Sequence, residues 1–157
     1  MKSIRINLAL IVLLFVASCS TTKITANKIQ EVSTKVESKD FTVDVKYASP
    51  TSGQQIYLNY SYDLRIKNDS AFAYLPYYGV AYSAPYGGEG GIKFNEPMTQ
   101  YTCVKNKKGD GWDIRFKVRA KENVYDIYLS IFNNASATII VNSFNRQAIT
   151  FQGDLKD

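Results

Sequence analysis

From residue 41 onward, apolar and polar side chains alternate along the chain in short runs. The clearest run covers residues 112–119, where Trp112 and three further apolar residues alternate with charged ones. The longest run, residues 56–66, places Tyr60 and Tyr62 on its apolar face. A period of two predicts a β-strand that buries one face. Similar runs predict strands over residues 41–47, 72–75, 101–105, 125–131, 137–141 and 147–151.

The residues between these runs favour tight turns. Lys108-Gly109-Asp110-Gly111 and Asn133-Asn134 are typical of hairpins, because glycine and asparagine accept a positive φ at low cost. Parallel strands need crossover connections of roughly a dozen residues, for which the chain leaves no room. We therefore expect a mainly β fold, an antiparallel sandwich or barrel-like sheet of about eight strands.

One segment of the mature chain has the spacing of a helix. Between Asn27 and Lys39, the apolar residues Ile29, Val32 and Val36 recur at intervals of three and four. This pattern predicts one short N-terminal helix with a narrow apolar stripe, which we expect to pack on one side of the sheet. No internal repeat or second domain is evident, so residues 27–157 are predicted to form a single domain.

The first residues have the pattern of a targeting segment. Lys2 and Arg5 precede an unbroken apolar run of ten residues, Leu8 to Ala17. About twenty residues are needed to cross a bilayer as a helix, so this run is too short for a membrane span. A positive start followed by a short apolar run is typical of a signal peptide.

The end of the apolar run, Val16-Ala17-Ser18-Cys19, resembles the lipobox of bacterial lipoproteins. The resemblance implies that residues 1–18 are removed, that Cys19 is acylated, and that residues 19–26 form a tether. Two or more acyl chains would anchor the protein stably in a membrane. No acidic residue directly follows Cys19, so we expect the outer membrane, on the side that faces the periplasm. An ordinary secretory leader is the alternative.

Composition narrows the chemistry further. The chain has no histidine, which excludes Ser–His and Cys–His nucleophiles and most zinc or copper sites. Without Lys2 and Arg5 the chain carries 17 basic and 14 acidic side chains, a net charge of +3. The basic residues are scattered, so we expect no nucleic-acid partner. We predict no catalytic residue, metal site or cofactor, although a pair of carboxylates could still support an enzyme.

The second cysteine, Cys103, has no partner for an intramolecular disulfide once Cys19 carries lipid. It lies in the strand-like sequence Tyr-Thr-Cys-Val, and no histidine is available to activate it. We expect it to be a small buried apolar residue.

One segment, residues 74–97, departs from the alternating pattern. It holds five of the nine glycines and three of the four prolines. We expect residues 77–91 to form a surface loop whose tyrosines partly line a shallow groove, because tyrosine combines an apolar face with a hydroxyl group. The alternative is a structural lid whose rings fill the end of the core. The candidate binding residues are Tyr77, Tyr78, Tyr82 and Tyr86.

The same segment carries a resemblance to a known family. Residues 74–79 (Tyr-Leu-Pro-Tyr-Tyr-Gly), 81–88 and 90–92 resemble the domain-of-unknown-function family 4251, small lipoproteins of Bacteroidota-type bacteria. The family more often has arginine at Val80 and proline at Ala148. The resemblance implies family membership and a cell-envelope location, and it implies no activity.

Two classes of function fit these observations. The first is a cell-envelope lipoprotein that acts as a structural or interaction module with another envelope protein. The second is a binding module that holds an envelope saccharide or peptide through residues 77–91. An exposed tyrosine loop would favour binding, whereas a flat apolar sheet face or an unprotected edge strand would favour the interaction module.

Overall fold

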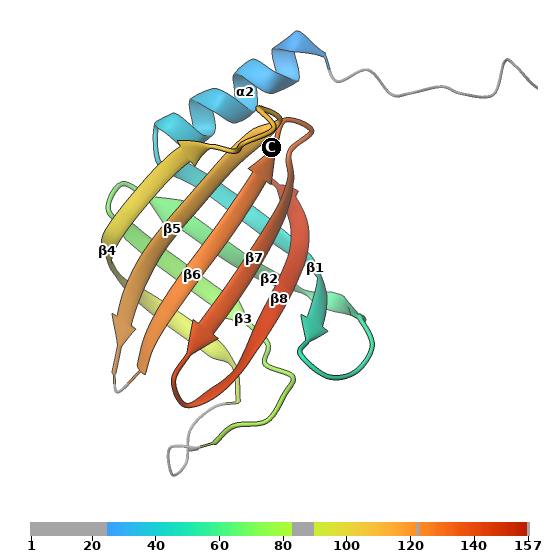
Figure 1. The fold of residues 1–157 in the computed structure, drawn as a ribbon, viewed down its shortest axis with the longest axis vertical. Coiled ribbons are helices and arrows are strands. Elements are labelled where there is room, and N and C mark those ends of the chain that lie inside the picture. The colour runs from blue at the N-terminus through green and yellow to red at the C-terminus, as the bar shows by residue number, and fades with distance from the viewer. Residues whose placement is uncertain (1–24, 83–89, 122, 157) are drawn as a thin grey trace, which may run out of the picture.

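The computed structural model describes residues 25–82, 90–121 and 123–156, and these form a closed barrel of eight strands (Figure 1). Each strand pairs antiparallel with the next, and β8 pairs with β1 to close the barrel. The predicted mainly β, antiparallel fold is confirmed, and the architecture is a barrel rather than a sandwich. The strands are β1 Asp40–Pro50, β2 Ile56–Lys67, β3 Ser70–Leu75, β4 Ile92–Lys105, β5 Gly111–Ala120, β6 Asn123–Phe132, β7 Ser136–Ser143 and β8 Arg146–Leu155.

Side chains fill the inside of the barrel. Alternate residues of the strands point inward, and several of the largest are completely buried. An eight-stranded barrel has an interior just wide enough for side chains to fill, so the sequence alternation and the barrel size agree. The fully buried residues include Leu64, Ile66, Ile114, Phe116, Ile127, Leu129, Ile139 and Phe151.

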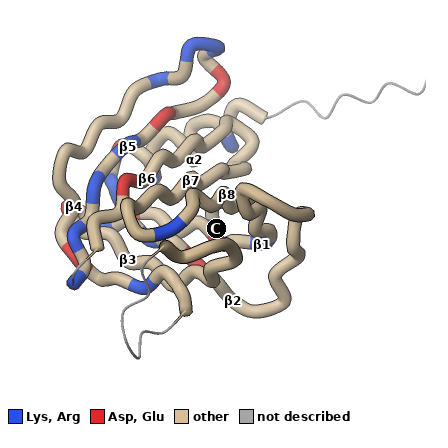
Figure 2. Tube along the Cα trace, turned by 60° about the horizontal axis from the view of Figure 1, so that its bottom comes forward, with Lys and Arg blue, Asp and Glu red and all other residues tan. Residues whose placement is uncertain are grey.

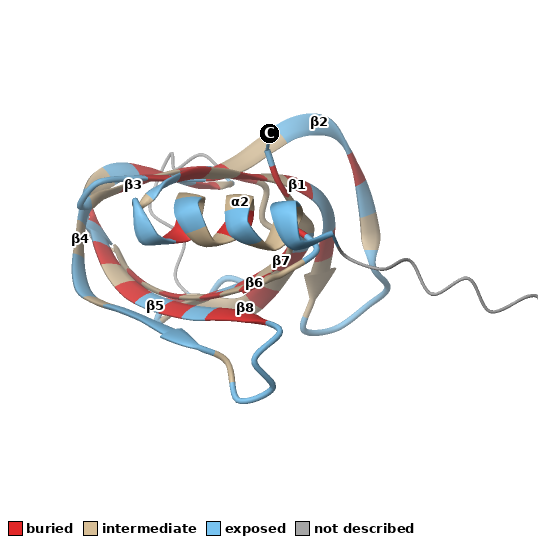
Figure 3. Ribbon diagram, turned by 90° about the horizontal axis from the view of Figure 1, so that it is seen from above, coloured by how far each residue is buried: buried red, intermediate tan, exposed pale blue. Residues whose placement is uncertain are grey.

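The single helix in the described part of the chain, α2 (Ala26–Glu37), lies across one end of the barrel (Figures 1 and 3). Its narrow stripe inserts Val32 and Val36 into the core, where both are buried. We expected the helix on one side of a sheet. It closes the barrel end instead, because two valines one turn apart match a small opening better than a broad sheet face. This helix is too short and too polar to cross a membrane.

The barrel closes through a close approach of β8 and β1. Val45 pairs with Gly153, and a Cβ atom at Gly153 would overlap the carbonyl oxygen of Asp44. A residue without a side chain is therefore required where the two strands meet. A β-bulge follows at once, between Val45 and Tyr47.

The same bulge makes β2 leave the barrel wall. Val45 pairs with Tyr62 and Tyr47 pairs with Tyr57, so four residues of β2 lie opposite one residue of β1. Figure 3 shows this part of β2 standing away from the ring of strands. Alternation placed Tyr60 on the apolar face, but it is 73% exposed. The prediction is wrong at Tyr60 because the period of two carries no information about bulges.

Strand β4 is longer than the sequence pattern predicted. It begins at Ile92, within the segment that we expected to be irregular, and Ile92 and Phe94 are buried in the core. The sequence does not predict the first part of β4, because it contains Pro97 and proline usually interrupts the hydrogen bonds of a sheet. Here Pro97 is the last residue of β4 that pairs with β3.

Cys103 is exposed, which corrects the prediction that it is buried. It lies in the C-terminal half of β4, after the residues that pair with β3. Only β5 therefore lies beside it in the sheet of described residues. The thiol group of Cys103 is partly buried, and this burial raises its pKa.

Candidate functional site

The loop that follows β3 lies at the end of the barrel opposite α2 (Figure 1). Its described part joins the turn between β7 and β8 through two backbone hydrogen bonds. The amide of Tyr82 donates to the carbonyl of Asn145 at 2.8 Å, and the amide of Gln147 donates to the carbonyl of Val80 at 3.0 Å. Residues 77–82 are thereby held against the end of the barrel.

Tyr77 fixes this loop through its side chain. Its hydroxyl lies 3.0 Å from the carbonyl oxygen of Val80 and 3.1 Å from that of Gln147, and can donate to either. The guanidinium group of Arg146 lies over the ring, 4.8 Å from its centroid. Burial raises the pKa of Tyr77. This residue therefore acts as a structural clamp between the loop and β8.

Gly79 makes the clamp possible. Its φ is +153°, and a Cβ atom there would lie 2.8 Å from the hydroxyl oxygen of Tyr77. Any side chain would push the hydroxyl away from Val80. The glycine of the Tyr-Tyr-Gly motif thus has a steric role.

The turn that receives the loop is itself held by buried polar groups. Asn145 is buried, its amide group donates to the Asn123 side chain at 2.6 Å, and its side-chain oxygen accepts from Ser143 at 3.0 Å. Buried polar atoms that are all paired give a rigid support. The described loop residues rest on this support.

The remaining predicted site residues are dispersed. Tyr78 and Tyr82 are exposed, by 36% and 68%, and Tyr82 lies on the β8 side of the loop. Tyr86 and the lipidation residue Cys19 lie outside the described residues. The three described tyrosines, Tyr77, Tyr78 and Tyr82, do not share one groove, because Tyr77 is directed into the support.

A different set of rings comes together beside Tyr78. Tyr62 stacks on Tyr74 with a centroid distance of 5.5 Å and an interplanar angle of 21°. Tyr60 meets Tyr62 edge to face at 6.4 Å. We call Tyr60, Tyr62, Tyr74 and Tyr78 the tyrosine surface. It joins the bowed part of β2, the end of β3 and the start of the loop.

The electrostatics of the tyrosine surface follow from its packing. Tyr62 packs against the core, and burial raises its pKa, with the neighbouring hydroxyls of Tyr78, Tyr74 and Tyr60 adding to the effect. The ammonium group of Lys93 lies 5.0 Å from the centroid of Tyr74. The tyrosine surface is thus aromatic and edged with hydroxyl groups and the ammonium group of Lys93.

Of this surface, only Tyr78 is a candidate binding residue by sequence. The alternating pattern predicts Tyr60 and Tyr62 on a buried strand face and Tyr74 within a short strand. A usable signal was present in residues 57–62, Tyr-Leu-Asn-Tyr-Ser-Tyr, because three tyrosines so close together exceed what a narrow core can hold.

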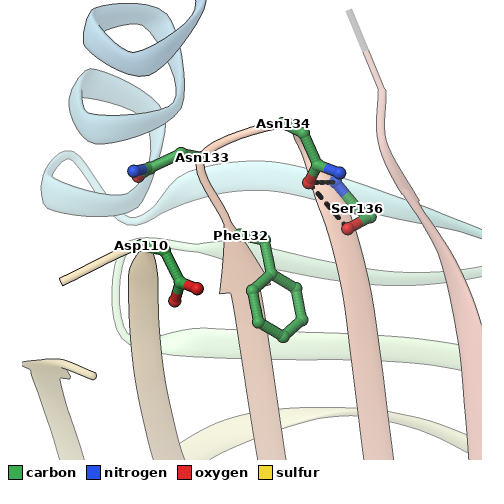
Figure 4. Close-up of a pocket in the computed structure, with 5 residues that line it drawn as sticks. All are labelled: Asp110, Phe132, Asn133, Asn134 and Ser136. Atoms are coloured by element: carbon green, nitrogen blue, oxygen red, sulfur yellow. Dashed lines mark hydrogen bonds between the residues drawn. The ribbon is translucent and has the colours of Figure 1, made fainter. Parts of the chain in front are cut away.

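The described residues offer little else that could act as a site. A depression of about 350 Å³ lies between the β4–β5 and β6–β7 turns, lined by Asp110 and Phe132 among others (Figure 4). Most of its polar groups pair nearby: Ser136 donates to Asn134, and Asp110 accepts from Asn106. The buried side-chain oxygen of Asn133 has no hydrogen-bond partner among the described residues. Within residues 25–82, 90–121 and 123–156, no three metal-ligating side chains are gathered.

Comparison with known proteins agrees with the geometry. A family model described as "Domain of unknown function (DUF4251)" matches residues 23–155. The crystal structure of a DUF4251 family protein from Bacteroides eggerthii superposes with a TM-score of 0.65 and 18% sequence identity, over 83% of this chain and 87% of that chain. At this identity the likeness shows the fold alone. A comparison with curated proteins gives no match.

Proposed function

The chain belongs to the DUF4251 family, whose description names no activity, and from its surface we propose that it is a lipid-anchored cell-envelope domain that binds a saccharide. The observation that carries this proposal is the tyrosine surface. This group of packed aromatic rings could bind a ligand. It differs from the group of loop tyrosines that the sequence predicts.

The chemistry of the tyrosine surface suits a sugar. A pyranose ring has an apolar face of C–H groups and an edge of hydroxyls. The exposed ring of Tyr60 offers a flat face for the first, and the hydroxyls of Tyr60 and of the stacked pair Tyr62–Tyr74 offer hydrogen bonds for the second. The stacking holds Tyr62 and Tyr74 in place before a ligand arrives, which lowers the entropy lost on binding.

The position of the surface fits an anchored protein. A lipid on Cys19 would be joined to Thr25 by six residues, which span at most about 20 Å. A tether of this length would hold α2 close to a membrane. Strands of about ten residues tilted by roughly 40° span about 25 Å, so the tyrosine surface at the other end would face away from the membrane.

Binding without chemistry is the function that these residues support. The interior of the barrel is filled, so it offers no enclosed substrate site. The strand carboxylates Asp113 and Asp126 lie on the outer face and are engaged by Ser130 and Arg115. Neither carboxylate lies at the tyrosine surface.

Titration with soluble glycan strands of peptidoglycan, freed of their peptides, tests the proposal. The protein is the full chain in detergent micelles, and tyrosine fluorescence and chemical shifts report binding. We expect Tyr60→Ala to weaken binding at least fivefold without loss of thermal stability, because this ring is largely exposed. Phe144→Ala is the matched control, since Phe144 is also 73% exposed but lies on the β7–β8 turn.

The outcome separates the alternatives. Equal binding by the wild type and Tyr60→Ala would remove the tyrosine surface from the proposal. Binding of the peptide stems in place of the glycan would identify a peptide ligand and overturn the saccharide. An absence of binding to either would leave the tyrosines as a structural feature and overturn the binding function.

A further inference from the structure

The upper half of β4 is a strand edge that the barrel leaves open. Residues Ile92–Pro97 of β4 pair with β3, whereas the stretch from Met98 to Lys105 pairs only with β5. Among the described residues, no strand lies on the second side of Thr99–Lys105. Figure 3 shows this stretch as exposed. An open edge of this kind is a template for another strand.

The hydrogen bonds of the β4–β5 hairpin show which backbone groups of β4 face the open edge and could pair with another strand. The amide of Asn106 donates to the carbonyl of Gly111 at 3.0 Å, so these two residues form a hydrogen-bonded pair. Hydrogen-bonded and non-hydrogen-bonded pairs alternate in an antiparallel ladder. Cys103 and Lys105, paired with Ile114 and Trp112, are therefore non-hydrogen-bonded, and their N–H and C=O groups face the open edge.

A backbone irregularity limits the edge. Gln100 has a φ of +54°, and the register of β4 against β5 shifts between Thr99 and Thr102. A bulge in an edge strand blocks pairing at that point. The regular part of the edge thus extends from Thr102 to Lys105, and it includes the outward-facing backbone groups of Cys103 and Lys105.

Side chains next to this edge can add specificity. Val104 is 60% exposed, and together with Thr102, Arg115 and Tyr128 it lines a shallow groove of about 290 Å³ on the outer face of β4–β6. In strand addition, backbone hydrogen bonds provide affinity and such grooves accept alternate side chains.

The charges around the edge disfavour a second copy of the chain. Symmetric antiparallel pairing would centre on Cys103 and place Lys105 of one copy against Tyr101 of the other. The ring of Tyr101 already has the ammonium group of Lys39 at 4.6 Å from its centroid. Lys105, whose ammonium group lies 4.0 Å from the centroid of the Trp112 ring, would then bring a second cation next to Lys39. Lysines on an edge strand are a common protection against self-association.

The same charges favour an acidic strand. Lys105, Lys107 and Lys108 gather at the tip of the β4–β5 hairpin, which also holds Asp110. Figure 2 shows Lys and Arg positions along this tip. We propose that the edge from Thr102 to Lys105 accepts an extended acidic segment of a partner protein as an added strand. This inference does not depend on saccharide binding, because the edge lies at the α2 end of the barrel.

The experiment uses the full chain in micelles and a synthetic nine-residue peptide in which valine and aspartate alternate. Amide hydrogen exchange of residues 101–105 is followed as the peptide is added. We expect the amides of Cys103 and Lys105 to become at least tenfold slower. The amides of Thr102 and Val104, already bonded to β5, should change little. A ligand bound elsewhere on the surface would not produce this alternation.

Variants make the test specific. Cys103→Pro removes an N–H that β5 does not use, so it should abolish peptide binding, while Cys103→Ala should bind as the wild type does. If Cys103→Pro unfolds the hairpin, Lys105→Glu with Lys107→Glu replaces it and should weaken binding more than tenfold. A peptide with lysine at the aspartate positions should not bind.

Three results would overturn the proposal. The first is uniform exchange along residues 101–105 with the acidic peptide present. The second is equal binding of the acidic and basic peptides. The third is a dimer of the chain that forms without peptide and is lost in Cys103→Pro, which would assign the edge to self-pairing.

Discussion

The guanidinium group of Arg146 lies 4.8 Å from the ring centroid of Tyr77, although the two residues are far apart in the sequence. Arg146 opens β8, and Tyr77 lies just after β3, so the contact crosses the end of the barrel. A cation over an aromatic face is favourable, more so where water is partly excluded. This pair and the hydroxyl of Tyr77 hold residues 77–82 in position.

The first prediction concerns this clamp. Tyr77→Phe keeps the ring under Arg146 but removes the hydroxyl that lies near the carbonyls of Val80 and Gln147. We expect a loss of about 1 kcal/mol in unfolding free energy, the usual contribution of one hydrogen bond. Urea unfolding measures the loss, and the amides of Tyr82 and Gln147 should exchange faster. Unchanged exchange at both amides would show that the backbone bonds alone fix the loop.

The fold could be predicted from the sequence where local patterns decide it. Burial follows a period of two along β5, from Trp112 to Val118, as the alternation requires. The choice of barrel over sandwich could not be predicted, because it depends on β8 meeting β1. That contact requires a glycine at position 153, and the residues around Gly153 contain no pattern that marks it as the point of closure.

The candidate site was predicted less well, for a reason that lies in β2. The bowing of β2 exposes Tyr60 at a position that alternation assigns to the core. Conversely, the sequence predicts that Tyr77 faces a ligand. In the structure, the positive φ of Gly79 lets the hydroxyl of Tyr77 reach the backbone carbonyl of Val80 instead. Both outcomes depend on a backbone irregularity, which residue types alone do not specify.

Closure of the barrel leads to the second prediction. Gly153→Ala should destabilise the protein by about 3 kcal/mol, because a methyl group there overlaps the Asp44 carbonyl and must push β1 and β8 apart. Gly90→Ala is the control, since no atom of the described residues lies within 4 Å of its Cβ position. Thermal unfolding compares the two variants. A melting temperature for Gly153→Ala equal to that of Gly90→Ala would contradict the tight approach.

The third prediction concerns the anchor. Cells given labelled fatty acid should label the wild-type protein and leave Cys19→Ala unlabelled, because acylation needs the thiol of Cys19. The variant should also lose membrane association, since buried acyl chains contribute about 0.8 kcal/mol per CH₂ group. Cys103→Ala serves as the control and should remain labelled. Equal labelling of wild type and Cys19→Ala would refute the lipobox interpretation.

The last prediction follows from Tyr101. Its ring packs on Phe116 at 6.4 Å, and its hydroxyl is buried without a hydrogen-bond partner among the described residues. Burial, with the nearby Cys103 thiol, raises its pKa well above 10. The folded state therefore holds this proton more tightly than the unfolded state. The resulting stability is complete below pH 10 and is lost as the pH rises above it, by about 1.4 kcal/mol per unit.

Tyr101→Phe should remove this alkaline loss. At pH 8 the variant should be as stable as the wild type or slightly more so, because it no longer buries an unpaired hydroxyl. Between pH 10 and 11 the unfolding free energy of the wild type should fall more steeply than that of the variant. Urea unfolding at each pH measures both. Parallel curves would mean that the Tyr101 hydroxyl is reached by water in the folded protein and titrates as it does in the unfolded chain.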